Sequence, residues 1–140
     1  MSDLLFTLSW LVGDRLVRAE RNESQAWSLY FESGATLFIE CLWRKLENGV
    51  LVFTSEDHRQ KFGLSAPFDS IAALAELSLF SVSTVSVREG TADISLHFGE
   101  HICLEIIPTS GGYESWSAKH PVLGTVFASA GGQLNVYKTA

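Results

Sequence analysis

Two stretches of this sequence repeat each other and decide its fold: WSLYF at residues 27–31 and ISLHF at residues 94–98. They lie 67 residues apart, and the same offset places Leu37 over an identical residue, Leu104. Apolar and polar residues alternate in both stretches, as expected of β-strands with one buried face. An internal repeat of this kind predicts that one structural unit is used twice.

Each stretch is predicted to open a β-hairpin whose register follows from its apolar residues. In the second hairpin, pairing Phe98 with Ile102 sends the alternating apolar side chains of both strands to one face. The same register in the first hairpin pairs Phe31 with Ala35, and Gly34 then takes the turn position that needs a left-handed backbone. Because a slip of one residue would turn the apolar face outward, the agreement between the hairpins supports both registers.

A third strand is expected before each hairpin, and a helix before each of these strands. We align the two leading strands by placing Val17 over Val85. This alignment implies that the turn between the leading strand and the hairpin is one residue shorter in the second half than in the first. Asp69 is the predicted N-cap of a helix over 70–79, and Asp3 opens a similar apolar segment with Leu4, Leu5, Leu8 and Leu11. The expected strands are 15–21, 25–32 and 35–44 in the first half, and 82–89, 92–98 and 102–107 in the second.

Further strands are expected between and after the halves. Asn48-Gly49 predicts a type I′ turn into a strand over 50–53, followed by a polar loop over 54–66. Another strand is expected over 113–118, and Gly131-Gly132 joins 125–128 to 134–137 in a last hairpin. The expected fold class is α+β: a curved antiparallel sheet from two related helix-plus-three-strand halves, with an extra C-terminal hairpin. We predict a single domain over 1–140, with halves at approximately 3–53 and 68–108 and C-terminal strands over 113–138.

The composition is that of an ordinary globular protein with a mild negative charge. Of the 140 residues, 46% are hydrophobic and 19% are charged, and the net charge is −6. Nucleic-acid binding requires a basic surface, so this charge argues against it, whereas it favours encounter with a basic protein partner. The alternative is that the negative charge serves only to keep the protein soluble.

The sequence indicates a cytoplasmic protein. The apolar stretch 4–12 is too short to span a bilayer core of about 30 Å, and it lacks the basic flank and cleavage site of a signal peptide. Cys41 and Cys103 lie far apart and form no CxxC motif, which favours reduced thiols. We therefore expect no association with a membrane.

The sequence contains none of four common catalytic or cofactor-binding motifs: G-x-S-x-G, H-E-x-x-H, the P-loop and G-x-G-x-x-G. The hairpin register places His97 opposite Cys103, with Glu105 on the same face and His101 in the adjoining loop. Imidazole and thiolate bind zinc, but a closed zinc site takes four ligands. A half-covered thiol beside a polar imidazole is the simpler interpretation. We expect no metal, no cofactor and no enzymatic activity.

Five residues are candidates for contact with a partner. Tyr113 and Trp116 are expected on one face of their strand with Glu114 on the other, and tyrosine and tryptophan often anchor interfaces. The same aromatic residues would also suit a core. Glu56 and Asp57 add acidic groups in the polar loop. The predicted partner-binding set is therefore Glu56, Asp57, Tyr113, Glu114 and Trp116.

Four segments carry a resemblance to a known group: Leu11-Val12-Gly13, residues 31–40 (FESGATLFIE), Trp43-Arg44 and residues 113–116 (YESW). They resemble small uncharacterised bacterial proteins, some of which are similar to immunity proteins of contact-dependent or polymorphic toxin systems. The resemblance covers most of the chain, and its motifs contain no reactive group. It implies a protein-binding inhibitor of the immunity type that neutralises a basic toxin domain. The alternative is a small-molecule or metal-binding domain that uses the concave side of the sheet, with His97 and Cys103 as ligands.

Overall fold

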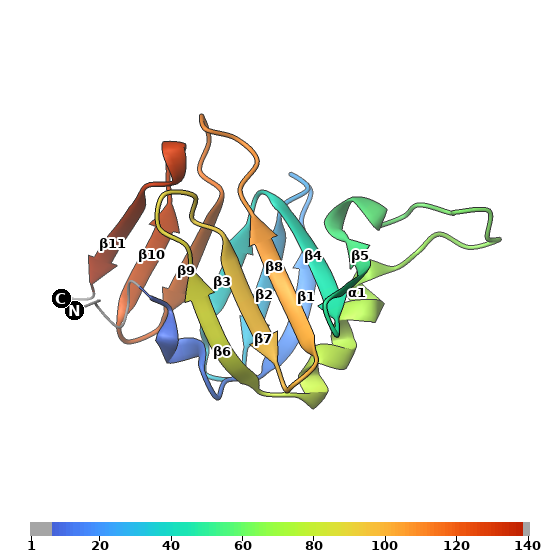
Figure 1. Ribbon diagram of the computed structural model, residues 1–140, viewed down its shortest axis with the longest axis horizontal. Helices are drawn as coiled ribbons and strands as arrows, with labels where there is room; N and C mark the ends of the chain where they lie inside the picture. Colours follow the sequence, from blue (N-terminus) through green and yellow to red (C-terminus); the bar gives the residue numbers. More distant parts are fainter. Residues whose placement is uncertain (1–6, 139–140) are drawn as a thin grey trace.

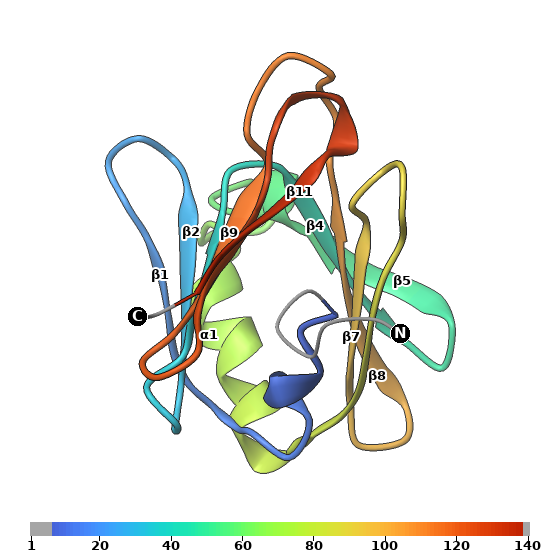
Figure 2. The same cartoon turned by 90° about the vertical axis from the view of Figure 1, so that its left-hand side faces the viewer.

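A computed structural model describes residues 7–138, which form two antiparallel sheets that face each other (Figures 1 and 2). The prediction of antiparallel sheet structure is therefore confirmed, but the α+β class with one curved sheet is corrected: the protein is mostly β, and neither of its two sheets is closed or curled. One sheet has six strands in the order β1 (Leu16–Arg21), β2 (Trp27–Phe31), β3 (Thr36–Ile39), β9 (Trp116–His120), β10 (Gly124–Ala128) and β11 (Leu134–Lys138). The other has five in the order β5 (Val50–Thr54), β4 (Leu42–Glu47), β8 (Ile102–Ile107), β7 (Ile94–Phe98) and β6 (Val82–Val87).

The helical part is small. The helix expected over 70–79 begins as predicted, with the Asp69 carboxylate accepting from the backbone N–H groups of Ile71 and Ala72. It is α-helical only as α1 (Ser70–Leu74) and continues as the 3₁₀ segment η3 (Ala75–Leu79), lying between the two sheets (Figure 2). The other 3₁₀ turns are η1 (Ser9–Leu11), η2 (Ser55–Asp57) and η4 (Ala130–Gly132). Asp3, Leu4 and Leu5 lie outside the described residues. No helix within 7–138 is long and apolar enough to cross a bilayer.

The predicted registers of both hairpins are confirmed. In β7–β8, Phe98 pairs with Ile102 and Leu96 with Leu104. In β2–β3, Leu29 pairs with Leu37, and the Phe31 N–H donates to the Ala35 carbonyl at 2.9 Å. The inward-facing residues of both hairpins are buried in one shared core. The apolar alternation therefore fixes which face of each hairpin is covered.

The predicted alignment of the two leading strands, which placed Val17 over Val85, is wrong. β1 and β6 each carry a bulge near their start, and Val17 lies at the bulge of β1, where it is 62% exposed. Ala19 pairs with Leu29 and Val85 pairs with Leu96, so Ala19, not Val17, matches Val85. The turn after the leading strand is longer in the second half, not shorter. A bulge adds a residue that the alternation of side chains does not reveal.

The two halves of the chain exchange strands. The meander β1–β2–β3 is extended by β9 and β10 from the second half, and β6–β7–β8 is extended by β4 and β5 from the first. Trp43 of β4 pairs with Ile106, and Trp116 of β9 pairs with Ile39, so the two tryptophans occupy matching positions. The exchange arises because the chain bends after β3, which breaks the single strand expected over 35–44. This bend creates two sheets where one was expected.

The starts of the leading strands meet each other. Arg15 and Ser81 form an isolated antiparallel bridge, and the Gly13 N–H donates to the Val82 carbonyl at 2.8 Å. The Val82 N–H donates to the Asp14 carbonyl, also at 2.8 Å. The two meanders are thus joined at equivalent points near the bottom of the view in Figure 1.

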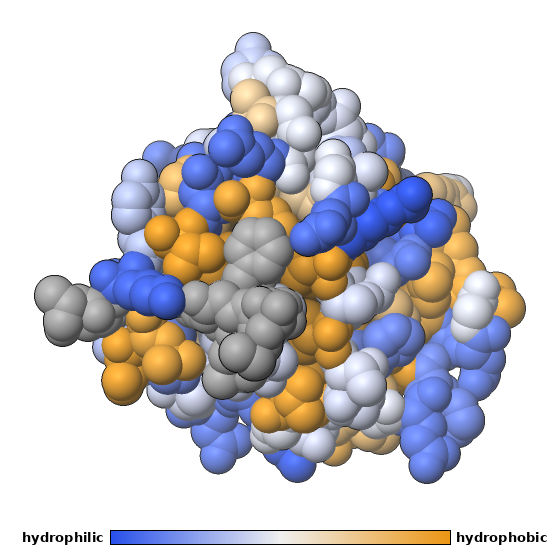
Figure 3. Space-filling view, turned by 60° about the vertical axis from the view of Figure 1, so that its left-hand side comes forward, coloured by the Kyte–Doolittle hydropathy of each residue, from blue (hydrophilic) through white to orange (hydrophobic). Residues whose placement is uncertain are grey.

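Two predicted hairpins are also confirmed, whereas the strand expected over 113–118 begins only at Trp116. Asn48 and Gly49 both have positive φ (52° and 77°), as a type I′ turn requires, and β5 follows. The last hairpin, β10–β11, also forms as predicted, with η4 at its tip. On the side of the molecule seen in Figure 3, apolar residues form several separate patches broken by hydrophilic ones.

Candidate partner-binding surface

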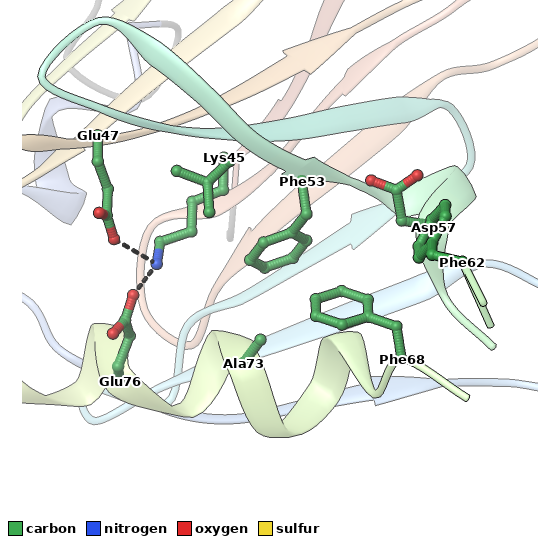
Figure 4. A pocket seen from close by; sticks show the side chains of 9 residues that line it. Lys45, Glu47, Phe53, Asp57, Phe62, Phe68, Ala73 and Glu76 are labelled. Carbon is green, nitrogen blue, oxygen red and sulfur yellow. Dashed lines mark hydrogen bonds and ion pairs between the residues drawn. The ribbon is translucent and has the colours of Figure 1, made fainter. Parts of the chain in front are cut away.

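A pocket opens between the β4–β5 hairpin and the α1–η3 segment (Figure 4). Its volume is about 540 Å³, within the range of sites that bind small ligands or the side chains of a partner. We call it the β5 pocket. It is lined by Lys45, Glu47, Val52, Phe53, Asp57, Phe62, Phe68, Ala73 and Glu76.

A buried lysine lies at one end of the β5 pocket. Lys45 is two residues after Trp43 in β4, so its side chain points inward as the tryptophan does, and it is only 3% exposed. Its ammonium forms ion pairs with Glu47, at 3.0 Å, and with Glu76 of η3. A buried ammonium needs such partners because desolvation disfavours an isolated charge. The two carboxylates are 45% exposed, so they cover the ammonium and face the solvent themselves.

Aromatic rings form the wall of the pocket. Phe53 and Phe68 meet edge to face with centroids 5.1 Å apart, and Trp43 packs against Phe53 in the same manner. Figure 4 shows both phenyl rings lying between the carboxylates at one end and Asp57 at the other. The pocket therefore has an apolar middle and acidic ends.

Large apolar side chains are exposed in β5 and in the loop after η2, and two of them, Val52 and Phe62, line the pocket. Val50, Leu51 and Val52 of β5 are 66%, 52% and 48% exposed, and β5 is an edge strand of its sheet. Phe62 and Leu64, in the loop after η2, are each 65% exposed. Two backbone hydrogen bonds, between residues 59–60 and Phe68, close the base of this loop. Contiguous exposed apolar residues with a polar rim are typical of interaction sites.

His58 connects the loop to α1. Its Nδ1 accepts from the Ser70 N–H at 3.1 Å, so the ring holds the first turn of the helix. Burial lowers the pKa of His58 below its ordinary value of 6.5, and the nearby guanidinium groups of Arg21 and Arg59 lower it further. The neutral imidazole is the form that this hydrogen bond requires.

The predicted acidic residues Glu56 and Asp57 lie beside the β5 pocket, in η2. Asp57 lines the pocket, and one of its oxygens accepts from the Thr54 N–H at 2.9 Å in a capping box. Glu56 is exposed next to it. Asp57 therefore has a structural role in addition to any contact with a partner.

The predicted partner-binding residues at 113–116 do not lie together: two are exposed and one is buried. Tyr113 is 77% exposed and Glu114 is also exposed; both border a separate hollow of about 300 Å³ in the loop between β8 and β9. Trp116 is fully buried, and its Nε1 donates to the Ala92 carbonyl at 2.8 Å. Its prediction as a partner-binding residue is wrong, because it belongs to the core. Tyr113 precedes β9 and is three residues from Trp116, a spacing that would place them on opposite faces of a strand.

The His97–Cys103 pair forms as the register predicted. The two residues are directly opposite, with Sγ and Nε2 3.8 Å apart, while Glu105 is engaged in an ion pair with Arg44. Burial, followed by the charge of Glu105, raises the pKa of Cys103 to about 11, which keeps the thiol protonated at neutral pH. Within residues 7–138, no three His, Cys, Asp or Glu side chains are placed to hold a metal ion. The lack of stoichiometric zinc stays a prediction.

Cys41 is less reactive still. Burial, reinforced by the charges of Asp93 and Glu40, raises the pKa of its thiol to about 12. Both cysteines are free thiols. Neither has the electropositive setting that activates a cysteine nucleophile.

The sequence did not predict the charged end of the β5 pocket, which is formed by Lys45, Glu47 and Glu76. A signal for Lys45 was present, because it lies two residues after Trp43 in β4 and its side chain therefore points to the same, inward face. No such signal identified Glu76, since its contact with Lys45 depends on how η3 packs beneath β4.

No family model, curated protein or solved structure matches this chain.

Proposed function

We propose that the protein is a binding protein of the inhibitor type, similar in role to immunity proteins, which occludes a basic toxin domain. The observation that carries this proposal is the β5 pocket. It combines an apolar wall, three carboxylates and one buried ammonium, and its lining includes two exposed apolar side chains, Val52 and Phe62. An acidic surface with an apolar centre is suited to a basic partner, because charge steers the encounter and apolar contacts slow dissociation.

Glu56, Asp57 and the exposed Phe62 are the surface residues that we assign to this interface. Tyr113 and Glu114 border a different hollow and would extend the contact only if the partner is large. Rim charges mainly affect the rate of association, whereas a central aromatic side chain affects the rate of dissociation.

The test is capture of the product of the adjacent gene from the source cell, followed by binding kinetics at two salt concentrations. We expect capture, and protection of cells in which the neighbour is toxic. Replacing Glu56 and Asp57 by Gln and Asn should slow association and reduce its salt dependence, while Phe62→Ala should speed dissociation. If the neighbour is not captured and gives no toxicity that this protein relieves, the proposal fails.

A second candidate function is the binding of a small molecule, which the volume of the β5 pocket favours. Such a ligand would be apolar with a cationic group, because the pocket presents carboxylates at both ends. Native mass spectrometry of protein purified from its source cell separates the two functions: a small bound mass supports the second, and a bound protein supports the first.

A further inference from the structure

We infer that the β5 pocket receives an arginine side chain from an extended segment of the partner, which pairs with the free edge of β5. This inference rests on the proposed function, since it assigns the chemistry by which the same surface recognises its partner. It requires a cationic side chain in the pocket and an extended backbone at the strand edge.

The charges in the pocket favour a cation. Its lining contains three acidic residues and one basic residue, and the basic one is 3% exposed beneath two carboxylates. A ligand entering from solvent therefore meets Glu47 and Glu76 before it meets Lys45. An anion would face these carboxylates and could not reach the ammonium.

The shape of the pocket favours arginine over lysine. The carboxylates of Glu47 and Glu76 both contact the same ammonium, so they converge from β4 and η3 on one point. A guanidinium group can donate to two carboxylates at once, and its planar face stacks on aromatic rings such as Phe53 and Phe68. An ammonium offers neither the planar face nor the fork of donors.

The strand edge explains how the side chain is delivered. The sequence of β5 is VLVFT, without a charge or proline, and only β4 pairs with it among the described residues. Unprotected edges of this kind accept an added strand from another chain. The edge strand β1, in contrast, carries Arg18, Glu20 and Arg21. Val52 and Phe53 belong both to β5 and to the lining of the pocket, so a strand at this edge lies beside its mouth.

Charge argues against a second copy of this chain as the occupant. Two copies joined through β5 would bring two pockets of the same net negative charge together, and the protein as a whole has a net charge of −6. Like charges at an interface disfavour association. A basic segment of a different protein has the complementary charge.

The probe is an acetylated and amidated nine-residue peptide of alternating threonine and valine with one central arginine. The matched control carries citrulline, which has nearly the shape of arginine but no charge. Binding to the full-length wild-type protein is followed by NMR titration. We expect shifts at β5 and in the pocket, and at least about tenfold weaker binding of the citrulline peptide, a difference of about 1.4 kcal/mol. A lysine peptide should bind with intermediate affinity.

Variants locate the charge that is recognised. Glu47→Gln combined with Glu76→Gln should remove the preference for arginine over citrulline, whereas Glu89→Gln, which changes an exposed acid in the turn after β6, should preserve it. Circular dichroism of the double variant checks that it is folded. The comparison of peptides on the wild-type protein needs no variant and so does not depend on this check.

Three results would overturn the inference: equal affinity for the arginine and citrulline peptides, shifts confined to residues away from β5, or self-association through β5 detected by sedimentation. The results that would contradict the proposed function are different from these three. If the arginine peptide binds as expected but the neighbour is not captured, the site stands and the inhibitor role fails. If the partner binds the double variant with unchanged affinity, the role stands and the site fails.

Discussion

The two matched tryptophans show how a single polar group changes the contribution of a buried side chain. Both are fully or almost fully buried at equivalent places in the two sheets. The indole N–H of Trp116 donates to the Ala92 carbonyl, whereas that of Trp43 has no hydrogen-bond partner among the described residues. A satisfied buried group stabilises the fold, while an unsatisfied one has a desolvation penalty without compensation.

We predict that Trp116→Phe destabilises the protein more than Trp43→Phe, by about 1–2 kcal/mol, because only the first change leaves a carbonyl without its donor. Equilibrium unfolding in urea gives both values. Each variant loses similar ring volume, so each is a control for the other. Equal losses would mean that the Ala92 contact contributes nothing to stability.

At the scale of elements, α1 is attached by a contact that depends on protonation, and the tip of the last hairpin by a close backbone approach. The bond from Ser70 to His58 is the first of these. The unfolded chain binds a proton at His58 near the ordinary pKa of 6.5, whereas in the folded protein burial lowers this pKa, so the proton binds only at lower pH. The stability from neutral His58 is therefore present above pH 6.5 and is lost as the pH falls through the lowered folded value.

We accordingly predict that His58→Gln reduces the loss of stability on acidification. Its amide oxygen can accept from Ser70 without titrating. The measurement is the free energy of unfolding in urea at about pH 7.5 and about pH 5, on either side of the unperturbed histidine value. An unchanged pH dependence in the variant would show that carboxylates, not His58, control acid stability.

The tip of the last hairpin gives a second prediction at this scale. Gly131 and Gly132 both have φ of +74°, but a Cβ on Gly132 would lie 2.4 Å from the Gly90 carbonyl oxygen, whereas one on Gly131 meets nothing within 4 Å. Both Ala variants should lose about 1 kcal/mol to backbone strain. Gly132→Ala should lose a further ~1–3 kcal/mol, because the hairpin must move away from the turn after β6. Thermal unfolding of the pair tests this, and equal losses would contradict the close approach.

At the scale of the whole molecule, neither half of the chain contains a complete sheet. We predict that fragments 1–66 and 67–140, cut in the exposed loop before Pro67, are unfolded alone and form β-structure when mixed. Each sheet takes strands from both fragments, and the buried residues form one core. Circular dichroism of the separate and mixed fragments measures the outcome. A folded single fragment would show that its meander is stable without the strands contributed by the other half.

The sequence was sufficient to predict how neighbouring strands pair within each hairpin. It was not sufficient to predict how the strands are distributed between the two sheets. Alternation around Leu29 and Leu96 was sufficient for both hairpin registers, and Asn48-Gly49 was sufficient for the turn into β5. The exchange of β4 and β9 between sheets depends on contacts far apart in the chain, so no local pattern revealed it. For the same reason Glu56 and Asp57 were found as loop acids, while the Lys45–Glu76 pair that they accompany was not.

The bridge between Arg15 and Ser81 has a consequence for the origin of the molecule. If the first half existed as a separate chain, two copies could form two five-stranded sheets as a strand-swapped homodimer with its symmetry axis at this bridge, and β11 is the strand without a counterpart. Such a dimer would display two identical pockets. Duplication and fusion of such a chain would free each position to diverge: Lys45 faces Leu104, and its counterpart Ala118 faces Leu37 and is fully buried. Fusion would thus convert a molecule with two copies of the β5 pocket into one that has this pocket on one side and a closed core at the matching place.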